Sequence, residues 1–241
     1  MSAALVKLTA IVQEAAAKHT ATVIILHGFG DSGAGWQVSP SAPVGEQPRT
    51  SLPHVKFVFP NASARPITSM GGMLVPAWYD IPPMVGERRQ QDEQGLLLAG
   101  HQVMQLVREE VDQHGIHANR IVIGGFSQGC ALGLFTGLTS EYKLAGIVAL
   151  SGYLPIDNKI MTMVADANRK TPIFWGHGDD DQVVKYEHGE QSVKFLQEQK
   201  YPVEFHTYPR MAHSACLQEI KDIQSFLNKT LPKEMPILAK S

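Results

Sequence analysis

The chain is built around one stretch, Ile121-Val122-Ile123-Gly124-Gly125-Phe126-Ser127-Gln128-Gly129-Cys130-Ala131. The apolar, β-branched residues at its start predict a strand, and the small and apolar residues at its end predict a helix. Between them lies a sharp turn with Ser127 at its apex. Gly125 and Gly129 fit this turn, because it strains the serine backbone and larger side chains on either side would collide. The pentapeptide Gly-Phe-Ser-Gln-Gly at residues 125–129 also fits a pattern that arises by chance. Whether it indicates catalysis depends on a histidine, an acid and an oxyanion site in the right order.

Length and composition set the outer limits of the fold. The chain has 241 residues, enough for a well-buried core, and we expect a single α/β domain over residues 1–241. Its formal net charge of −2 lacks the clustered basic excess of a nucleic-acid-binding surface, so we expect no nucleic-acid partner. Its two cysteines, Cys130 and Cys216, fit a reducing compartment and are interpreted as small core residues.

The sequence contains no recognisable targeting segment. The apolar run near the N-terminus is short, and Gln13 and Glu14 interrupt its continuation. No apolar run approaches the roughly 20 residues that cross a bilayer. We therefore expect a soluble intracellular protein.

Strands and helices alternate along the rest of the chain. We expect strands at residues 21–26, 55–59, 144–150, 172–175 and 203–208, and helices at residues 90–114, 184–199 and 214–228. Residues 39–53 and 65–83 lack periodicity. Continuous apolar strands separated by helices predict an α/β fold with a mostly parallel central sheet flanked by helices. Residues 151–172 are too few to form a large helical cap domain.

Four loops that follow strands carry chemically unusual residues. They are residues 27–33, Ser127, residues 178–181 and His213. In a parallel sheet such loops meet at the carboxyl edge of the strands. A serine followed by an acid and then a histidine is the chain order of α/β-hydrolases. Order and placement together therefore predict a serine hydrolase.

The general base is expected to be His213. A serine hydroxyl becomes a useful nucleophile only when a neighbouring imidazole takes its proton, and His213 lies in the loop after the last predicted strand. His177 is a rival by location, but it precedes the acid on the same loop. His206 lies within a strand, which would fix its side chain to one face of the sheet.

The acid that orients this histidine is left open by the residues alone. Asp179, Asp180 and Asp181 compete, and Asp157 is a weaker candidate. Asp181 is furthest along the loop, and we expect the two valines at residues 183–184 to anchor the turn in the core. The three adjacent carboxylates could also form a solvated turn or a cation site, but the run does not fit the calcium-loop pattern. We expect no metal ion.

The oxyanion site is expected to contain two backbone N–H groups. One belongs to Gln128, the residue after the nucleophile, and the other to the glycine-rich loop after an early strand. We choose Phe29 for the second amide, because the glycines beside it let the main chain approach a substrate closely.

The same loop also matches a dinucleotide-binding fingerprint. Residues 28–33 read Gly-Phe-Gly-Asp-Ser-Gly, which fits G-x-G-x-x-G after a strand. The fingerprint also requires a helix that opens at once and a second strand ending in an acid. We expect neither, because prolines follow at positions 40 and 43 and the next strand ends in Pro60-Asn61. We therefore reject a nucleotide-binding oxidoreductase and expect no cofactor.

Five ordered motifs resemble the acyl-protein thioesterase/lysophospholipase family of α/β-hydrolases. They are Leu-His-Gly-Phe-Gly-Asp-Ser-Gly at 26–33, Pro-Ala-Trp-Tyr-Asp at 76–80, Gly-Phe-Ser-Gln-Gly at 125–129, His-Gly-Asp-Asp-Asp at 177–181 and Met-Ala-His-Ser at 211–214. The similarity runs over about residues 11–227. It implies an α/β-hydrolase fold and a triad of Ser127, Asp181 and His213. The oxyanion amides of the family fall on Phe29 and Gln128.

The resemblance also implies a reaction and a location. Members of the family remove palmitoyl groups from cysteines of intracellular proteins through an acyl-enzyme, and many also act on short esters and lysophospholipids. S-acylated proteins are therefore the expected partners and lysophospholipids a further substrate class. We expect a cytoplasmic protein, with the nucleus as a further location.

Three features depart from the family pattern. Gln182 replaces the proline that usually follows the triad aspartate. Ser2 replaces a cysteine that is lipidated in many members, so we expect no stable membrane anchor. The connection over residues 39–53 is longer than usual, and its role stays open.

The acyl group is expected to bind along residues 65–83. Met73, Val75 and Trp78 are the chosen substrate-binding residues, although ordinary loop packing would explain the same composition. A thioester suits the site, because a cysteine thiolate leaves more easily than an alkoxide. A broad carboxylesterase or lysophospholipase is the alternative enzyme. A non-catalytic binding module is disfavoured, because every triad and oxyanion position is filled.

Overall fold

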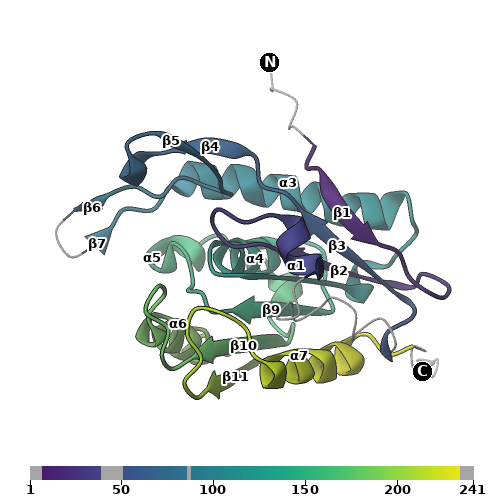
Figure 1. Ribbon diagram of the computed structural model, residues 1–241. Coiled ribbons are helices and arrows are strands. Elements are labelled where there is room, and N and C mark those ends of the chain that lie inside the picture. The colour runs from purple at the N-terminus through teal and green to yellow at the C-terminus, as the bar shows by residue number, and fades with distance from the viewer. Residues whose placement is uncertain (1–6, 39–50, 86–87, 234–241) are drawn as a thin grey trace.

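The computed structural model describes residues 7–38, 51–85 and 88–233 of the chain. A seven-stranded sheet lies at the centre of these residues (Figure 1); its strands are β1 (Ala10–Gln13), β2 (Ala21–Leu26), β3 (Val55–Pro60), β8 (Ile121–Phe126), β9 (Gly146–Leu150), β10 (Ile173–Gly178) and β11 (Val203–Tyr208). The strand order is β1-β3-β2-β8-β9-β10-β11. β1 is antiparallel to β3 and all other neighbours are parallel. The predicted mostly parallel sheet is confirmed.

The predicted strands agree with the structure within a few residues. β2 and β11 have the predicted bounds, β3 is one residue longer, β9 begins two residues later, and β10 extends to Gly178. β10 outlasts its apolar residues because it pairs along its whole length with β11. The short half-buried β1 was not predicted, and its antiparallel pairing with β3 adds an outer strand to the sheet.

Helices cover both faces of the sheet. They are α1 (Gly33–Val38), α3 (Glu93–Asp112), α4 (Gln128–Thr139), α5 (Asp157–Ile160), α6 (Tyr186–Glu198) and α7 (Leu217–Thr230), with single turns η1 (Thr68–Met70), η2 (Ala118–Arg120) and η3 (Asp166–Asn168). Side chains of α3, α4 and α6 share one core cluster with one face of the strands. Side chains of α1 and α7 share a second cluster with the other face. The sheet is therefore buried on both sides, which explains its continuous apolar strands.

Helix α3 is shorter than the prediction at both ends. Its N-cap is Asp92, whose carboxylate accepts a hydrogen bond of 2.9 Å from the Gly95 amide. This cap places the start after residue 92 instead of near residue 90. The predicted apolar face is correct: Leu96, Ala99, Val103, Leu106 and Val107 are all buried.

The segment predicted to be irregular contains a β-hairpin. β4 (Ala64–Ile67) pairs antiparallel with β5 (Met73–Pro76), and η1 and two glycines with positive φ connect them. The two-residue strands β6 (Met84–Val85) and β7 (Arg88–Arg89) follow. Figure 1 shows both pairs at the periphery, outside the main sheet. The prediction of no regular structure over residues 65–83 was wrong.

The glycine-rich loop after β2 leads into helix α1, which the sequence did not predict. α1 spans only six residues. The expected absence of a helix was therefore wrong, although β3 still ends in Pro60 without an acid. The connection over residues 39–50 lies outside the described residues.

Residues 151–172 form no large cap. They contain only the short α5 and η3. The carboxyl ends of the parallel strands are therefore not covered by an inserted helical domain. Within the described residues, no helix is long and apolar enough to cross a membrane.

Candidate active site

Ser127 lies in a strained turn between β8 and α4. Its φ of 55° and ψ of −117° are unusual for a residue with a side chain. The turn requires both flanking glycines: a Cβ on Gly125 would clash with the carbonyl group of Gly129, and a Cβ on Gly129 would clash with the carbonyl oxygens of residues 26 and 27. The Ser127 amide donates to the carbonyl of Leu150, 2.9 Å away. The predicted strand, sharp turn and helix are therefore present, with Ser127 at the apex of this elbow.

The structure brings His213 together with Asp181. The Nδ1 of His213 lies 2.7 Å from Oδ2 of Asp181, 32 residues earlier in the chain. The carboxylate of Asp181 is fully buried, and 16% of the His213 side chain is exposed. A carboxylate accepts, so Nδ1 carries the hydrogen and leaves Nε2 free to take a proton. The His213 ring also packs against Phe126, with a distance of 4.6 Å between ring centroids.

The loop that carries Asp181 holds the carboxylate through its own backbone. Oδ1 of Asp181 accepts hydrogen bonds of 2.9 Å from the amides of both Val183 and Val184. The expectation that these valines anchor the turn through the core was wrong for Val183, whose side chain is 71% exposed. The backbone amides of Val183 and Val184 hold the turn instead, because the lone pairs of a buried carboxylate need hydrogen-bond donors.

The competing acids lie elsewhere. Asp179 and Asp180 are exposed, and the Asp179 carboxylate accepts a hydrogen bond from the Arg210 amide. Asp157 begins α5. Among the candidate acids, Asp181 is the one whose carboxylate contacts His213.

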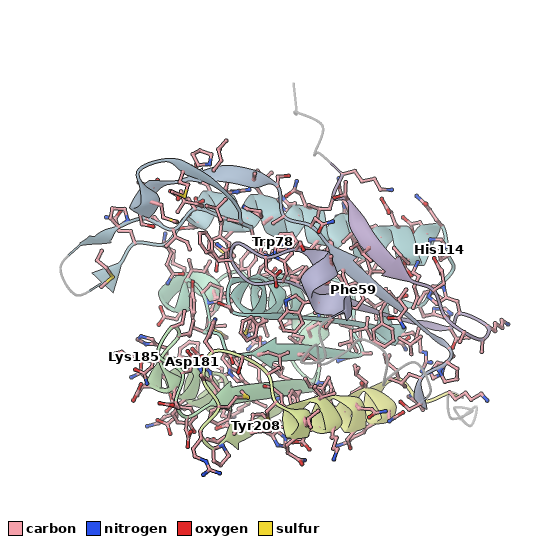
Figure 2. The ribbon with its side chains drawn as sticks, in the orientation of Figure 1. Phe59, Trp78, His114, Asp181, Lys185 and Tyr208 are labelled. Atoms are coloured by element: carbon pink, nitrogen blue, oxygen red, sulfur yellow. The ribbon has the colours of Figure 1, made fainter. Side chains whose placement is uncertain are left out.

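Backbone hydrogen bonds join the acid loop to the base loop. The amide of Asp179 donates to Tyr208, and the amide of Asp180 donates to Met211, each over 3.2 Å. Gly178 lies so close to Met211 that a Cβ would clash with its carbonyl oxygen. The two loops are thus held as one unit at the carboxyl ends of β10 and β11. Figure 2 shows Asp181 beside α6 on this side of the sheet.

The two residues expected to supply oxyanion amides both lie next to Ser127: Gln128 follows it in the chain, and Phe29 lines the same pocket. Gln128 is the first residue of α4, so its N–H belongs to the helix-terminal groups without an intrahelical acceptor. In the part of the chain that the structure describes, no backbone acceptor is found for the Phe29 amide. Gly28 packs closely on the elbow, because a Cβ there would lie 3.2 Å from the Phe126 ring and 3.5 Å from the Ser127 side chain.

The side chain of Gln128 has a role that the sequence did not suggest. Its Oε1 accepts a hydrogen bond of 2.9 Å from the Trp78 amide, and its Nε2 donates over 2.8 Å to the Tyr79 carbonyl. The Trp78 indole donates to the carbonyl of His27, 2.8 Å away. Gln128 therefore ties residues 78–79 to the elbow, and the Trp78 indole ties them to the glycine-rich loop.

Ser127 and His213 line one open pocket of about 360 Å³. Its lining is Gly28, Phe29, Asp31, Gly35, Trp36, Phe126, Ser127, Val183, His213, Ser214 and Ala215. The lining combines Ser127, His213 and the glycine-rich loop with several apolar side chains. Such an arrangement can hold a carbonyl group beside the serine.

The three predicted substrate-binding residues do not share one environment. Met73 is 58% exposed on β5, whereas Val75 is half-buried. β5 is attached to the glycine-rich loop, because the Gly30 amide donates to the Pro76 carbonyl over 2.9 Å. Trp78 is only 1% exposed and lies in the core between the hairpin and α4 (Figure 2). Its indole is bonded to His27 of the glycine-rich loop and leaves almost no exposed surface for a substrate.

The remaining groups give no metal centre within residues 7–38, 51–85 and 88–233: no cluster of three or more His, Cys, Asp or Glu side chains there could hold an ion. Cys130 is fully buried beside the elbow, and burial raises the pKa of its thiol. It fits the interpretation as a core residue.

Comparison with known proteins identifies the family. Residues 8–231 match the family described as Phospholipase/Carboxylesterase. The chain belongs to this family. One member, acyl-protein thioesterase 1 of Neurospora crassa, is 49% identical over 225 residues, which cover 91% of this chain and 90% of the relative. Acyl-protein thioesterase 1 of Mycosarcoma maydis is 45% identical over 228 residues, which cover 90% and 94%.

Solved structures agree with this membership of the Phospholipase/Carboxylesterase family. Acyl-protein thioesterase 2 of Zea mays superposes with a TM-score of 0.78 at 26% identity, over 92% of this chain and 99% of that one. SOBER1 of Arabidopsis thaliana superposes with a TM-score of 0.76 at 32% identity, over 88% and 99%. The α/β-hydrolase fold expected from the sequence is confirmed.

Proposed function

We propose that the protein is a serine hydrolase that removes S-acyl groups, such as palmitoyl, from cysteines of other proteins. One observation carries this proposal: a strained serine shares a pocket with a histidine whose Nδ1 is bound to a buried carboxylate. The relatives named acyl-protein thioesterase 1 support the choice of substrate. The proposed nucleophile is Ser127, the base is His213 and the orienting acid is Asp181.

The proposed reaction has two halves. His213 takes the Ser127 proton while the serine oxygen attacks the thioester carbonyl, and the Phe29 and Gln128 amides stabilise the resulting oxyanion. The intermediate collapses, the C–S bond breaks, and the cysteine thiolate leaves with the proton from the imidazolium. Water, activated by His213, then attacks the acyl-Ser127 ester. The fatty acid leaves, and the serine regains its proton.

A thioester needs less help from the protein than an oxygen ester does. A cysteine thiol has an ordinary pKa of about 8.5, so its thiolate is a far better leaving group than an alkoxide. The proton that His213 supplies to the leaving group is therefore less important. The open pocket also fits an acyl group that is attached to a large protein.

The acyl chain is proposed to extend along β5. Met73 and Val75 would contact it there, since the Gly30–Pro76 hydrogen bond places this strand beside the glycine-rich loop. Trp78 would act indirectly, by supporting the loop from the core. The exposure of Met73 supports this role, because an exposed methionine adapts readily to a flexible apolar ligand.

A broad carboxylesterase or lysophospholipase is the second candidate. The absence of a large cap over residues 151–172 and the description of the family favour it. Short oxygen esters or lysophospholipids would then be the main substrates, attacked by the same serine.

Two experiments test the proposal. A fluorophosphonate probe should label Ser127 stoichiometrically and should not label the Ser127→Ala variant, whereas folded wild-type protein that resists labelling would contradict the enzyme. Rates on a ladder of acyl thioesters and matched oxygen esters separate the two candidates. A preference for long-chain thioesters supports deacylation of proteins, and equal preference for short oxygen esters supports the carboxylesterase.

The proposed location is the cytoplasm, with the nucleus as a further location. Both cysteines are free, as expected in a reducing compartment. Fluorescence of a tagged full-length chain in cells measures the location directly, and accumulation in the secretory pathway would contradict it.

A further inference from the structure

His177 is a buried histidine directly behind the proposed triad. It occupies the penultimate position of β10, four residues before Asp181, and its side chain is fully buried. Its Nε2 lies 2.8 Å from the carbonyl oxygen of Val184 and 3.4 Å from Oδ2 of Asp181. The imidazole therefore touches both the acid and the loop that holds the acid.

The contacts of His177 define its protonation. A carbonyl oxygen can only accept, so Nε2 must carry a hydrogen and donate it to Val184. Its Nδ1 is buried and finds no hydrogen-bond partner among the described residues. Burial lowers the pKa of His177, which keeps the ring neutral. His177 is thus a donor at Nε2, and it does not line the pocket that contains Ser127 and His213.

This donor completes the hydrogen bonding of the Asp181 loop. Val184 donates its amide to Oδ1 of Asp181 and receives the His177 N–H at its carbonyl oxygen. The same N–H lies close to Oδ2, the oxygen that binds His213. Val184 is therefore held by two hydrogen bonds, one from its N–H to Asp181 and one from His177 to its carbonyl oxygen.

Two residues of α6 pack against the imidazole of His177. Gly189 of α6 packs on the ring, and a Cβ at this position would clash with Nδ1. The edge of the Tyr186 ring lies on another side, with 5.8 Å between ring centroids. Asp181, His213 and Tyr186 are the titratable groups around His177, and α6 fixes the ring against the first of them.

We infer that His177 is a positioning residue, whose Nε2–H holds Val184 and Asp181 so that the carboxylate keeps hydrogen on Nδ1 of His213. The inference rests on the triad proposed above. It adds a fourth side chain that acts through the acid without touching the substrate. Small displacements of such a group are costly, because misplacement by about 1 Å can reduce a rate about 100-fold.

The principal test compares two variants of His177. His177→Leu fills the space without a donor, and His177→Gln offers a side-chain N–H at a similar reach. We expect kcat for a long-chain acyl thioester to fall roughly 10- to 100-fold in His177→Leu, with KM little changed, and to recover in His177→Gln. A folded His177→Leu protein with wild-type kcat would overturn the inference and leave the proposed function standing.

His54 provides a matched control. It is also buried, its Nε2 lies 3.0 Å from the carbonyl oxygen of Leu231, and its Nδ1 also finds no partner among the described residues. His54→Leu removes the same kind of bond at the amino end of β3. We expect it to lower stability without lowering kcat. An equal loss of kcat in both variants would show a general structural effect and would overturn the inference.

A double-mutant cycle tests whether His177 acts through Asp181. In the wild-type background, His177→Leu should slow fluorophosphonate labelling at Ser127 roughly 10- to 100-fold. In an Asp181→Asn background, it should change the labelling rate by less than about threefold. An equal loss in both backgrounds would overturn the inference. Failure of wild-type protein to label at Ser127 would instead remove the proposed function, and the inference with it.

If His177→Leu does not fold, the inference can be tested on the wild-type protein by NMR. Nitrogen chemical shifts of the labelled imidazoles should show His177 as the neutral Nε2–H tautomer from about pH 5 to about pH 8. A His177 ring that titrates in this range, or that carries its hydrogen on Nδ1, would overturn the inference.

Discussion

Asp181 presents its two carboxylate oxygens to two different kinds of donor. Oδ2 binds Nδ1 of His213, whereas Oδ1 binds the amides of Val183 and Val184. The two backbone N–H groups can only donate, so any side chain at position 181 must turn an acceptor oxygen toward them. This asymmetry makes the effect of one substitution predictable.

In Asp181→Asn, the amide oxygen must take the place of Oδ1 and the NH₂ group must face His213. Nδ1 then becomes an acceptor, and the hydrogen moves to Nε2, where the base is needed. We expect kcat to fall about 10⁴-fold without loss of folding. Thioester hydrolysis and thermal unfolding measure the two effects, with the exposed Asp180→Asn as control. A loss below tenfold would show that Asp181 does not set the tautomer.

Gln128→Ala keeps the backbone amide of the elbow and removes the side chain that binds residues 78–79. The Trp78 amide and the Tyr79 carbonyl would lose their buried partners. We expect a loss of stability of about 1–3 kcal/mol for each group left unpaired. Urea unfolding measures it. The control is Gln182→Ala, because the exposed side chain of Gln182 forms its hydrogen bonds to Asp180 in the same loop. Equal stability of the two variants would contradict the prediction.

Met73→Gln tests the acyl site proposed along β5. The side chain is 58% exposed, so the substitution should not alter the free energy of unfolding. Loss of an apolar contact with a fatty chain should lower kcat/KM for long-chain thioesters about tenfold. Short-chain substrates, which do not reach β5, should be little affected. Leu98→Gln on α3, at a side chain that is 47% exposed, is the control; a uniform loss across chain lengths would place the acyl chain elsewhere.

Glu219→Gln tests a carboxyl that is completely buried in the first turn of α7. Burial, helped by Asp222, raises its pKa to about 8 from an ordinary 4.5. Tyr208, Cys216 and Cys130 are the other titratable groups near it. The neutral form is required by the folded state, so its stabilising effect is complete below about pH 4.5 and is lost as the pH rises to about 8.

Over that range the free energy of unfolding should fall by about 1.4 kcal/mol per pH unit because of this group. Glutamine does not ionise, so the free energy of unfolding of the variant should rise relative to that of the wild type as the pH rises. Urea unfolding of both proteins at about pH 5 and about pH 8 measures the change. Parallel pH profiles would show that Glu219 is ionised in the folded protein.

The main sheet could be predicted because its strands are buried on both faces. The predicted bounds of β2 and β11 agree with the structure to the residue. β11 lies between two prolines, and β2 ends where the glycine-rich loop begins. The hairpin β4–β5 could not be read in the same way. Its strands have four residues each and contain Pro66 and Pro76, so pairing between segments, and not local preference, forms them. The single-domain organisation of residues 1–241 stays a prediction.

The sequence suggests an outline of the candidate site but not its supporting contacts, and the roles of its residues stay predictions. The order of Ser127, an acid and His213 was visible in the sequence, but three adjacent aspartates were left open by the residues alone. Burial and the 2.7 Å contact with His213 single out Asp181. The links from Gln128 to residues 78–79 join groups about fifty positions apart, and no local pattern announces such a pair.

The strand order places Ser127, the proposed nucleophile, after a central strand and His213, the proposed base, after an edge strand of the described sheet. Ser127 follows β8, which lies between two strands in the middle of the sheet, whereas His213 follows β11, which pairs only with β10 within the described sheet. An outer strand and its following helix can detach at a lower free energy than the centre. Local opening of β11 and α7 would move His213, the proposed base, away from Ser127. The strands on either side of β8 would stay paired in such an opening.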